Sequence, residues 1–185
     1  MKLAVLYAGQ GAQHPGMGKE FYEASPAFRA AFDSAALDFD LHRVCFEDPD
    51  GVLNQTEYTQ PCMVAFACGV TAVLAEKGVK PAYLAGLSLG EYSALEAAGV
   101  FTAKQAVELA AFRGKAMADA AKGIECGMTA VMNLAATHWQ SAAKRHPFWA
   151  VCRSAITTAR ASWSSAAKKP PWKRPLSCSA PPGSR

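Results

Sequence analysis

The sequence lacks the spacings that mark metal sites, membrane anchors and secretion signals. Its six cysteines form no C-x-x-C pair and its four histidines form no H-x-x-x-H pair, so we expect neither a metal nor another bound cofactor. No apolar run approaches the roughly 20 residues of a membrane helix, and the opening run of residues 3–8 is too short for a signal peptide. These absences predict a cytoplasmic protein with reduced thiols and no membrane partner.

Acidic residues are missing from the C-terminal part of the chain. Residues 135–185 contain nine Lys or Arg, no Asp or Glu, all four tryptophans and six of the eleven prolines. The formal net charge of +4 therefore combines an acidic first part with a strongly basic second part. A segment of this composition buries too little apolar surface to offset its ordering entropy. We expect mostly disorder there, with at most a short helix near residues 137–144.

Two hypotheses for residues 135–185 remain open. The first is out-of-frame translation of a GC-rich gene, because the change of composition near Leu134 is abrupt. The second is a genuine basic tail that binds nucleic acid or an acidic partner, with Lys168 and Lys169 on phosphates and Trp163 or Trp172 stacking. Because no other feature points to nucleic acid, we do not expect it as a partner.

Residues 1–134 alternate short apolar runs with amphipathic segments, which predicts an α/β fold with a mostly parallel sheet. The first strand is a continuous apolar run, typical of a strand buried on both faces. We expect strands at residues 3–7, 82–85 and 128–134. We expect helices to begin at residues 25–26, 59–61, 91 and 102, the first reaching residue 37 and the second closing at residue 78.

The segment Gly86-Leu87-Ser88-Leu89-Gly90 matches the pattern G-x-S-x-G, between an apolar strand and a helix. A sharp turn of this kind holds the serine in a strained backbone conformation with its hydroxyl exposed at a helix N-terminus. The helix dipole there favours developing negative charge. We therefore interpret Ser88 as a nucleophile for acyl transfer; a chance loop of Gly and Ser is the alternative.

The loop Gly9-Gln10-Gly11 follows the first strand and resembles the start of a dinucleotide-binding motif. His14 occupies the place of the last glycine of G-x-G-x-x-G, which argues against nucleotide binding. A glycine-rich turn after a strand can also aim backbone N–H groups at an oxyanion. A plain tight turn is the remaining alternative.

Four separated segments are informative together: residues 9–13 (GQGAQ), 59–61 (TQP), 86–94 (GLSLGEYSA) and 113–117 (RGKAM). In order and spacing they resemble bacterial malonyl-CoA:acyl-carrier-protein transacylases and the related acyltransferase domains of polyketide synthases. The resemblance covers about residues 1–134. It implies the N-terminal portion of a hydrolase-like, parallel-sheet acyltransferase subdomain, followed by residues 135–185 as an atypical basic extension.

The resemblance also implies a reaction and a set of roles. Ser88 would take a malonyl group from malonyl-CoA and pass it to the phosphopantetheine thiol of acyl carrier protein, in fatty acid or polyketide synthesis. The backbone N–H groups of Gln10 and Leu89 would form the oxyanion hole. Arg113 would pair with the malonyl carboxylate, and Gln60 would help position the acyl group. A solvated Arg113 and a first-turn polar Gln60 are the structural alternatives. We expect a monomer.

Two departures from the family pattern bear on activity. Leu87 stands where the commonest form of the elbow has histidine, which we treat as tolerated variation. The family's general-base histidine has no counterpart, since the segment around His146 does not resemble it. Because a serine without a base is a poor nucleophile, we expect impaired transfer. The alternatives are an inactive fragment, a noncatalytic protein that binds through its basic tail, or another serine acyl hydrolase.

Overall fold

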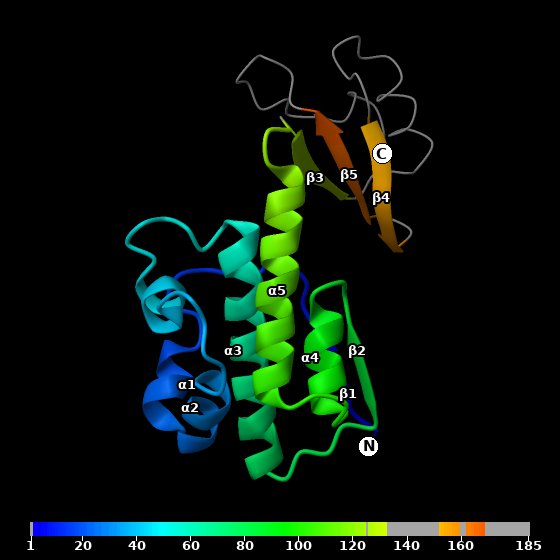
Figure 1. The fold of residues 1–185 in the computed structure, drawn as a ribbon. Coiled ribbons are helices and arrows are strands. Elements are labelled where there is room, and N and C mark those ends of the chain that lie inside the picture. Colours follow the sequence, from blue (N-terminus) through cyan, green and yellow to red (C-terminus); the bar gives the residue numbers. More distant parts are fainter. Residues whose placement is uncertain (1, 125, 133–151, 160–161, 169–185) are drawn as a thin grey trace, which may run out of the picture. The chain divides into compact units, whose positions relative to one another are not determined.

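The computed structural model describes residues 2–124, 126–132, 152–159 and 162–168 of the 185-residue chain (Figure 1). The chain divides into two compact units, Met1–Ala120 and Ala121–Arg185. The helices and the parallel strand pair described below confirm the predicted α/β class. The expected boundary at residue 134 stays a prediction.

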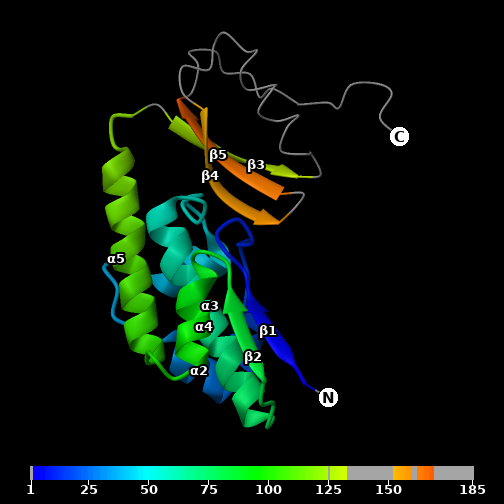
Figure 2. The same ribbon diagram turned by 90° about the vertical axis from the view of Figure 1, so that its right-hand side faces the viewer.

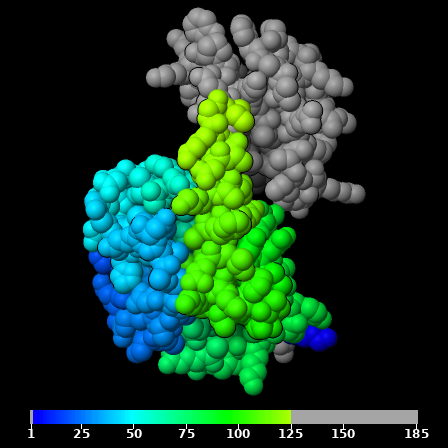
Figure 3. Space-filling view, viewed as in Figure 1, coloured from blue at the N-terminus to red at the C-terminus, as the bar shows by residue number. Residues whose placement is uncertain are grey.

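The first unit is built from two parallel strands and the helices around them (Figures 1 and 2). Its elements are β1 (Ala4–Tyr7), α1 (Lys19–Ala24), α2 (Pro26–Phe32), the π-helix η1 (Arg43–Glu47), α3 (Thr56–Glu76), β2 (Tyr83–Gly86), α4 (Gly90–Ala97) and α5 (Ala103–Ala121). In the register of the pair, Ala4 lies opposite Tyr83 and Tyr7 opposite Gly86. Figure 3 shows α5 crossing one face of this unit.

The helix starts confirm the predicted caps at two of the positions. The Ser25 hydroxyl accepts a hydrogen bond from the Phe28 N–H at 3.2 Å, at the start of α2. Before α5, the Thr102 hydroxyl accepts from the Gln105 N–H at 3.2 Å, and the Gln105 side chain accepts from the Thr102 N–H at 3.0 Å. This reciprocal pair is the predicted capping box. Helix α2 ends at Phe32 rather than near residue 37.

The predicted start of α3 at residues 59–61 is wrong by one turn. The N–H of Tyr58 and that of Thr59 already donate to the Gln55 carbonyl, at 3.0 and 2.8 Å. The Thr59 hydroxyl adds hydrogen bonds to the Leu53 and Gln55 carbonyls at 2.5 and 3.0 Å. These bonds build a turn ahead of Pro61, so the proline lies inside the helix. The helix closes at Gly78 as predicted, where φ is 72°.

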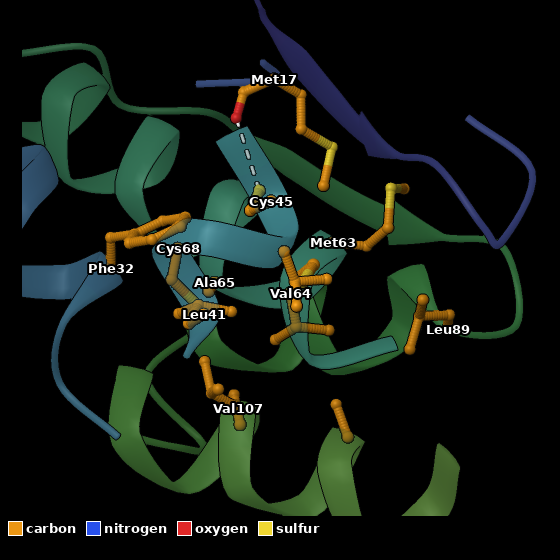
Figure 4. Packing of buried hydrophobic residues seen from close by; sticks show 14 of the residues in the cluster. Met17, Phe32, Leu41, Cys45, Met63, Val64, Ala65, Cys68, Leu89 and Val107 are labelled. Carbon is orange, nitrogen blue, oxygen red and sulfur yellow. Dashed lines mark hydrogen bonds between the residues drawn. The ribbon is translucent and has the colours of Figure 1, made fainter. Parts of the chain in front are cut away.

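Helix α3 lies at the centre of the core. Figure 4 shows its residues Val64 and Ala65 together with Val107 of α5 and Leu89, the residue before α4. By length and composition alone, α3 could cross a membrane, with 21 residues and a mean hydropathy of 1.4, contrary to the expectation from sequence. Nine of its residues are buried, which is the pattern of a central core helix.

The strand pair departs from the expectation of burial on both faces. Val5 and Tyr7 are half-buried, whereas Leu6 is 78% exposed and Tyr83 of β2 is 59% exposed. Helix α4 packs against both strands, and the Tyr7 hydroxyl shares a hydrogen bond with Thr71 of α3 at 2.8 Å. Within residues 2–124, these helices cover one face only, which leaves the apolar residues of the other face open.

The second unit contains an antiparallel sheet with the strand order β3-β5-β4. Its strands are β3 (Cys126–Met132), β4 (Cys152–Ala159) and β5 (Ser162–Lys168). Strand β3 confirms the strand expected near residues 128–134. Strands β4 and β5 lie within residues 135–185, where pairing across the sheet satisfies their backbone groups and all prolines lie outside the two strands. The expectation of mostly disorder in residues 135–185 stays a prediction. The short helix expected near residues 137–144 lies outside the described residues.

Candidate active site

Ser88 lies on the predicted sharp turn between β2 and α4. Its φ of 53° places a residue with a side chain in the left-handed region, where strain is tolerated mainly at functional turns. A Cβ on Gly86 would lie 2.1 Å from the Gly90 carbonyl carbon, and one on Gly90 would lie 2.3 Å from the Tyr7 carbonyl oxygen. The two glycines are therefore required by the tight approach of α4 to β1 and β2. Next to the serine, the buried Leu89 anchors the turn in the core.

The partly exposed Ser88 hydroxyl is contacted by Arg113, which α5 brings to the elbow. One guanidinium nitrogen (Nη2) donates to Ser88 Oγ at 3.2 Å, and the other (Nη1) donates to Gln60 Oε1 at 2.7 Å. The guanidinium carbon also lies 5.9 Å from the centre of the Tyr92 ring, within the range of a cation–π contact. Three predicted site residues, distant in sequence, therefore meet at one place.

Gln60 is fully buried, although it is polar. Its amide nitrogen donates to the thioether sulfur of Met117 at 3.3 Å, which leaves its oxygen facing Arg113. Helices α3 and α5 approach closely here, since a Cβ on Gly114 would lie 2.8 Å from the Thr56 carbonyl oxygen. This burial argues against the alternative of a first-turn polar residue in water.

Two residues of this cluster, Tyr92 and Met117, have no role assigned by the sequence reasoning. Both belong to quoted segments, Tyr92 in the elbow at 86–94 and Met117 in the segment 113–117. The helical spacing of four residues between Arg113 and Met117 puts them on the same face of α5. This spacing is the sequence signal that could have predicted Met117 as a neighbour of the site.

The loop after β1 lies against the elbow. A Cβ on Gly9 would lie 2.8 Å from the Leu87 carbonyl oxygen, and the Leu87 N–H donates to the Tyr7 carbonyl at 3.1 Å. The Gln10 side chain donates to the Thr56 hydroxyl at 3.1 Å. Among the described residues, the backbone amides of Gln10 and Leu89 donate no hydrogen bond. Their role as an oxyanion hole stays a prediction.

No proton acceptor for Ser88 is found in residues 2–124. Arg113 is the only group there that hydrogen-bonds to the hydroxyl, and a guanidinium has no acceptor site. The ring of His14 contacts the Pro15 carbonyl at 3.1 Å, and His42 pairs with Asp33 at 2.6 Å. His138 and His146 lie outside the described residues. The described part of the chain also holds no group of three or more His, Cys, Asp or Glu that could bind a metal.

Glu96 lies in α4, the helix that follows the nucleophile turn, and carries an unusual carboxyl group. Burial raises its pKa above the ordinary value, and its Oε2 atom has no hydrogen-bond partner among the described residues. Its neighbour Cys68 has a thiol whose pKa is also raised, first by burial and then by the charge of Glu96. Both effects favour the uncharged forms of the two groups.

A cavity of about 310 Å³ lies elsewhere in the first unit, between the residues that follow α2 and helices α3 and α5. Leu37, Phe39, Tyr58 and Phe112 supply its apolar lining. None of the predicted site residues lines it. The cavity is therefore separate from the elbow.

Comparison with known proteins identifies relatives of this arrangement. Residues 5–160 match the acyl transferase domain family. A malonyl CoA-acyl carrier protein transacylase of Bacillus subtilis is 40% identical over 135 residues, which are 72% of this chain and 43% of that protein. The polyketide biosynthesis protein ThaF of Burkholderia thailandensis is 42% identical over 132 residues, 71% of this chain and 11% of its own length. The chain thus spans less than half the length of these curated relatives.

Solved structures agree in fold. The malonyl CoA-acyl carrier protein transacylase of Clostridium perfringens superposes with a TM-score of 0.76 at 37% identity, covering 91% of this chain and 54% of that one. A malonyl-transacylase in complex with a type II polyketide synthase acyl-carrier protein superposes with a TM-score of 0.79 at 32% identity, covering 91% and 56%.

Proposed function

Since this chain belongs to the acyl transferase domain family, we propose that it carries the nucleophile portion of a malonyl-CoA:acyl-carrier-protein transacylase. The observation that carries the proposal is the contact of Arg113 with both Ser88 and the buried Gln60, at 3.2 and 2.7 Å. A cation beside the nucleophile suits an acyl group that ends in a free carboxylate.

The reaction has two halves. Ser88 Oγ attacks the thioester carbon of malonyl-CoA; the new C–O bond replaces the C–S bond, and coenzyme A leaves as a thiol with the proton from the serine. The thiol of the phosphopantetheine on acyl carrier protein then attacks the serine ester, which returns the proton to Ser88. This order agrees with the presence of an acyl-carrier protein in the structure of one relative.

Arg113 binds the free carboxylate of the malonyl group. Its guanidinium presents parallel donors that match the two oxygens of a carboxylate. Gln60 and the Tyr92 ring hold the guanidinium in place, and the Met117 sulfur fixes the orientation of the Gln60 amide. An acyl group without a carboxylate would leave this cation without an anionic partner, which disfavours a general serine acyl hydrolase.

The backbone amides of Gln10 and Leu89 stabilise the tetrahedral oxyanion. Support comes from the contact of the Gly9 loop with Leu87, and from the absence of other acceptors for the two amides among the described residues. Two preorganised N–H donors of this kind lower the barrier because the negative charge develops in front of them.

Transfer by this chain alone is impaired, because Ser88 has no proton acceptor in residues 2–124. An inactive fragment, or a binding protein acting through the basic residues 135–185, is the alternative that the lack of a proton acceptor within residues 2–124 favours. We place the reaction in the cytoplasm, on a monomeric protein, with malonyl-CoA and acyl carrier protein as partners and no cofactor of its own.

Radiolabelled malonyl-CoA tests the assignment. We expect weak or no labelling of the chain as it stands. We expect stable labelling once the C-terminal portion of a relative is fused to it, with complete loss in Ser88→Ala. Ser34→Ala is the matched control, because it removes a buried hydroxyl that has no hydrogen-bond partner in the part of the chain that the structure describes. Label that persists in Ser88→Ala, or a fused protein that folds and stays unlabelled, would refute the proposal.

A further inference from the structure

The cavity between the residues that follow α2 and helices α3 and α5 has aromatic walls. Phe39, Tyr58 and Phe112 all contribute to its lining. The rings of Phe39 and Tyr58 meet edge to face with their centres 5.0 Å apart, whereas Phe112 of α5 is 74% exposed. The volume of about 310 Å³ falls at the lower end of the range of small-molecule pockets. The cavity therefore has the size for one small organic molecule with an apolar body.

The charges of the lining are mostly negative. It contains one cation, Lys115, and three carboxylates: Asp38, Glu57 and Glu108. Lys115 lies 3.7 Å from Asp38, and Glu108 lies 3.8 Å from Lys104, which is outside the lining. Within residues 2–124, the Glu57 carboxylate forms no ion pair. The lining therefore offers one uncompensated carboxylate beside the aromatic rings.

We propose that this cavity binds an organic cation with a flat apolar body, that is, an aromatic amine in its ammonium form. The apolar body lies against the aromatic walls, where its removal from water is favourable. The ammonium group pairs with Glu57, and the faces of the neighbouring rings attract the same charge. A carboxylate or phosphate in this position would instead be repelled by the acidic lining.

The cavity is distinct from the malonyl site, so this inference does not rest on the proposed function. Arg113 and Lys115 are two positions apart on α5, and residues with that spacing do not face each other on a helix. Ser88 and Gln60 are also outside the lining. Coenzyme A joins its aromatic ring to several phosphates, and the charge of the lining therefore disfavours it as an occupant.

A pair of probes with the same ring and opposite charges tests the proposal. Tryptamine carries an ammonium group at neutral pH, and indole-3-propionate carries a carboxylate. In an NMR titration of the full chain, we expect tryptamine to bind with a Kd of about 1 mM. We expect indole-3-propionate to bind about tenfold more weakly, because its charge is repelled. Added salt narrows this difference, since it screens exposed charges.

Two variants locate the binding site. Glu57→Gln weakens tryptamine binding about threefold, because it removes the carboxylate that pairs with the ammonium group. Phe112→Ala weakens it by a similar factor of about three, because it removes an aromatic wall. The matched control is Glu20→Gln, which neutralises an exposed carboxylate of α1 outside the lining and leaves the Kd unchanged. Circular dichroism checks that each variant keeps the helical content of the unmodified chain.

The outcomes separate this site from the elbow. Ser88→Ala binds tryptamine as tightly as the unmodified chain, whether or not malonyl transfer takes place. Absence of binding, equal affinities for the two probes, or binding that is indifferent to both Glu57→Gln and Phe112→Ala overturns the proposal. Displacement of tryptamine by coenzyme A also overturns it, because the probe would then occupy the substrate site.

Discussion

Replacing Arg113 by alanine removes the group that satisfies Gln60 in the core. The Gln60 Oε1 atom accepts a 2.7 Å hydrogen bond from the guanidinium, and the Gln60 side chain is fully buried. Without Arg113, this oxygen stays buried without a partner, whereas the Ser88 hydroxyl is partly exposed and can turn to water. The expected loss therefore comes mainly from Gln60.

The size of the loss follows from the burial of the acceptor. Leaving a buried acceptor unpaired costs about 1–3 kcal/mol of the free energy of unfolding. Replacing Gln60 by leucine as well removes the orphaned oxygen, so the double variant recovers most of this cost. In the single variant Gln60→Leu, Arg113 loses its partner, but its half-exposed side chain remains solvated. We therefore expect a coupling free energy of about 1–3 kcal/mol between the two sites.

Urea unfolding of four proteins measures this coupling: the unmodified chain, Arg113→Ala, Gln60→Leu and the double variant. The assay needs no catalytic activity, so it applies to the chain as it stands. Lys115→Ala, two positions along α5 and largely exposed, is the control for loss of a cation on this helix. Additive effects within about 0.5 kcal/mol would refute the reasoning that Arg113 and Gln60 act as one unit.

Three further predictions concern the fold around the site. Because burial raises the Glu96 pKa, the contribution of Glu96 to stability is fully present below the unfolded-state pKa of about 4.3 and is lost as pH rises through the raised folded-state pKa. Glu96→Gln removes this loss, so urea midpoints measured across pH fall less steeply in the variant; equal slopes would contradict the assignment. Gly90→Ala forces a Cβ to 2.3 Å from the Tyr7 carbonyl oxygen, so it lowers the free energy of unfolding by about 3 kcal/mol. Gly78→Ala, where φ is 72° but no atom lies within 4 Å of the new Cβ, lowers it by about 1 kcal/mol. Similar losses in the two variants would count against the close approach of α4 to β1. The thiol pKa is raised in Cys62 by its hydrogen bond with Cys45 and then by burial, and in Cys68 first by burial, so we expect both thiols to stay unmodified by iodoacetamide at pH 8 until urea unfolds the chain. Rapid modification of the native protein, located by mass spectrometry, would show that this part of the core is open.

Local sequence signals predicted much of the first unit. Three features depend only on a few neighbouring residues: the Ser25 cap, the capping box at Thr102 and Gln105, and the elbow at Ser88. Their geometry can therefore be predicted without knowledge of the rest of the fold. The start of α3 was misplaced because proline marks a first turn only statistically. Hydrogen bonds that the Gln55 carbonyl accepts from the Tyr58 and Thr59 N–H groups build a turn ahead of Pro61.

The failures concern properties that depend on neighbours. Strand β1 reads as buried on both faces, but Leu6 is exposed because burial requires a covering layer, which the described residues provide on one side only. Strands β4 and β5 depend on backbone pairing with each other and with β3, and composition carries no record of such pairing.

What the sequence determined by itself is the chemistry of the candidate site: a serine between two glycines, an arginine on a later helix and a glutamine beside a proline. Only the tertiary structure decided how these groups act on one another. Helices α3 and α5 approach closely at Gly114, which brings Gln60, Arg113 and Ser88 within hydrogen-bonding distance and recruits Met117 and Tyr92 around them. Hydrogen bonds and burial are properties of pairs in space, so residues more than 20 positions apart acquire them only when the chain has folded.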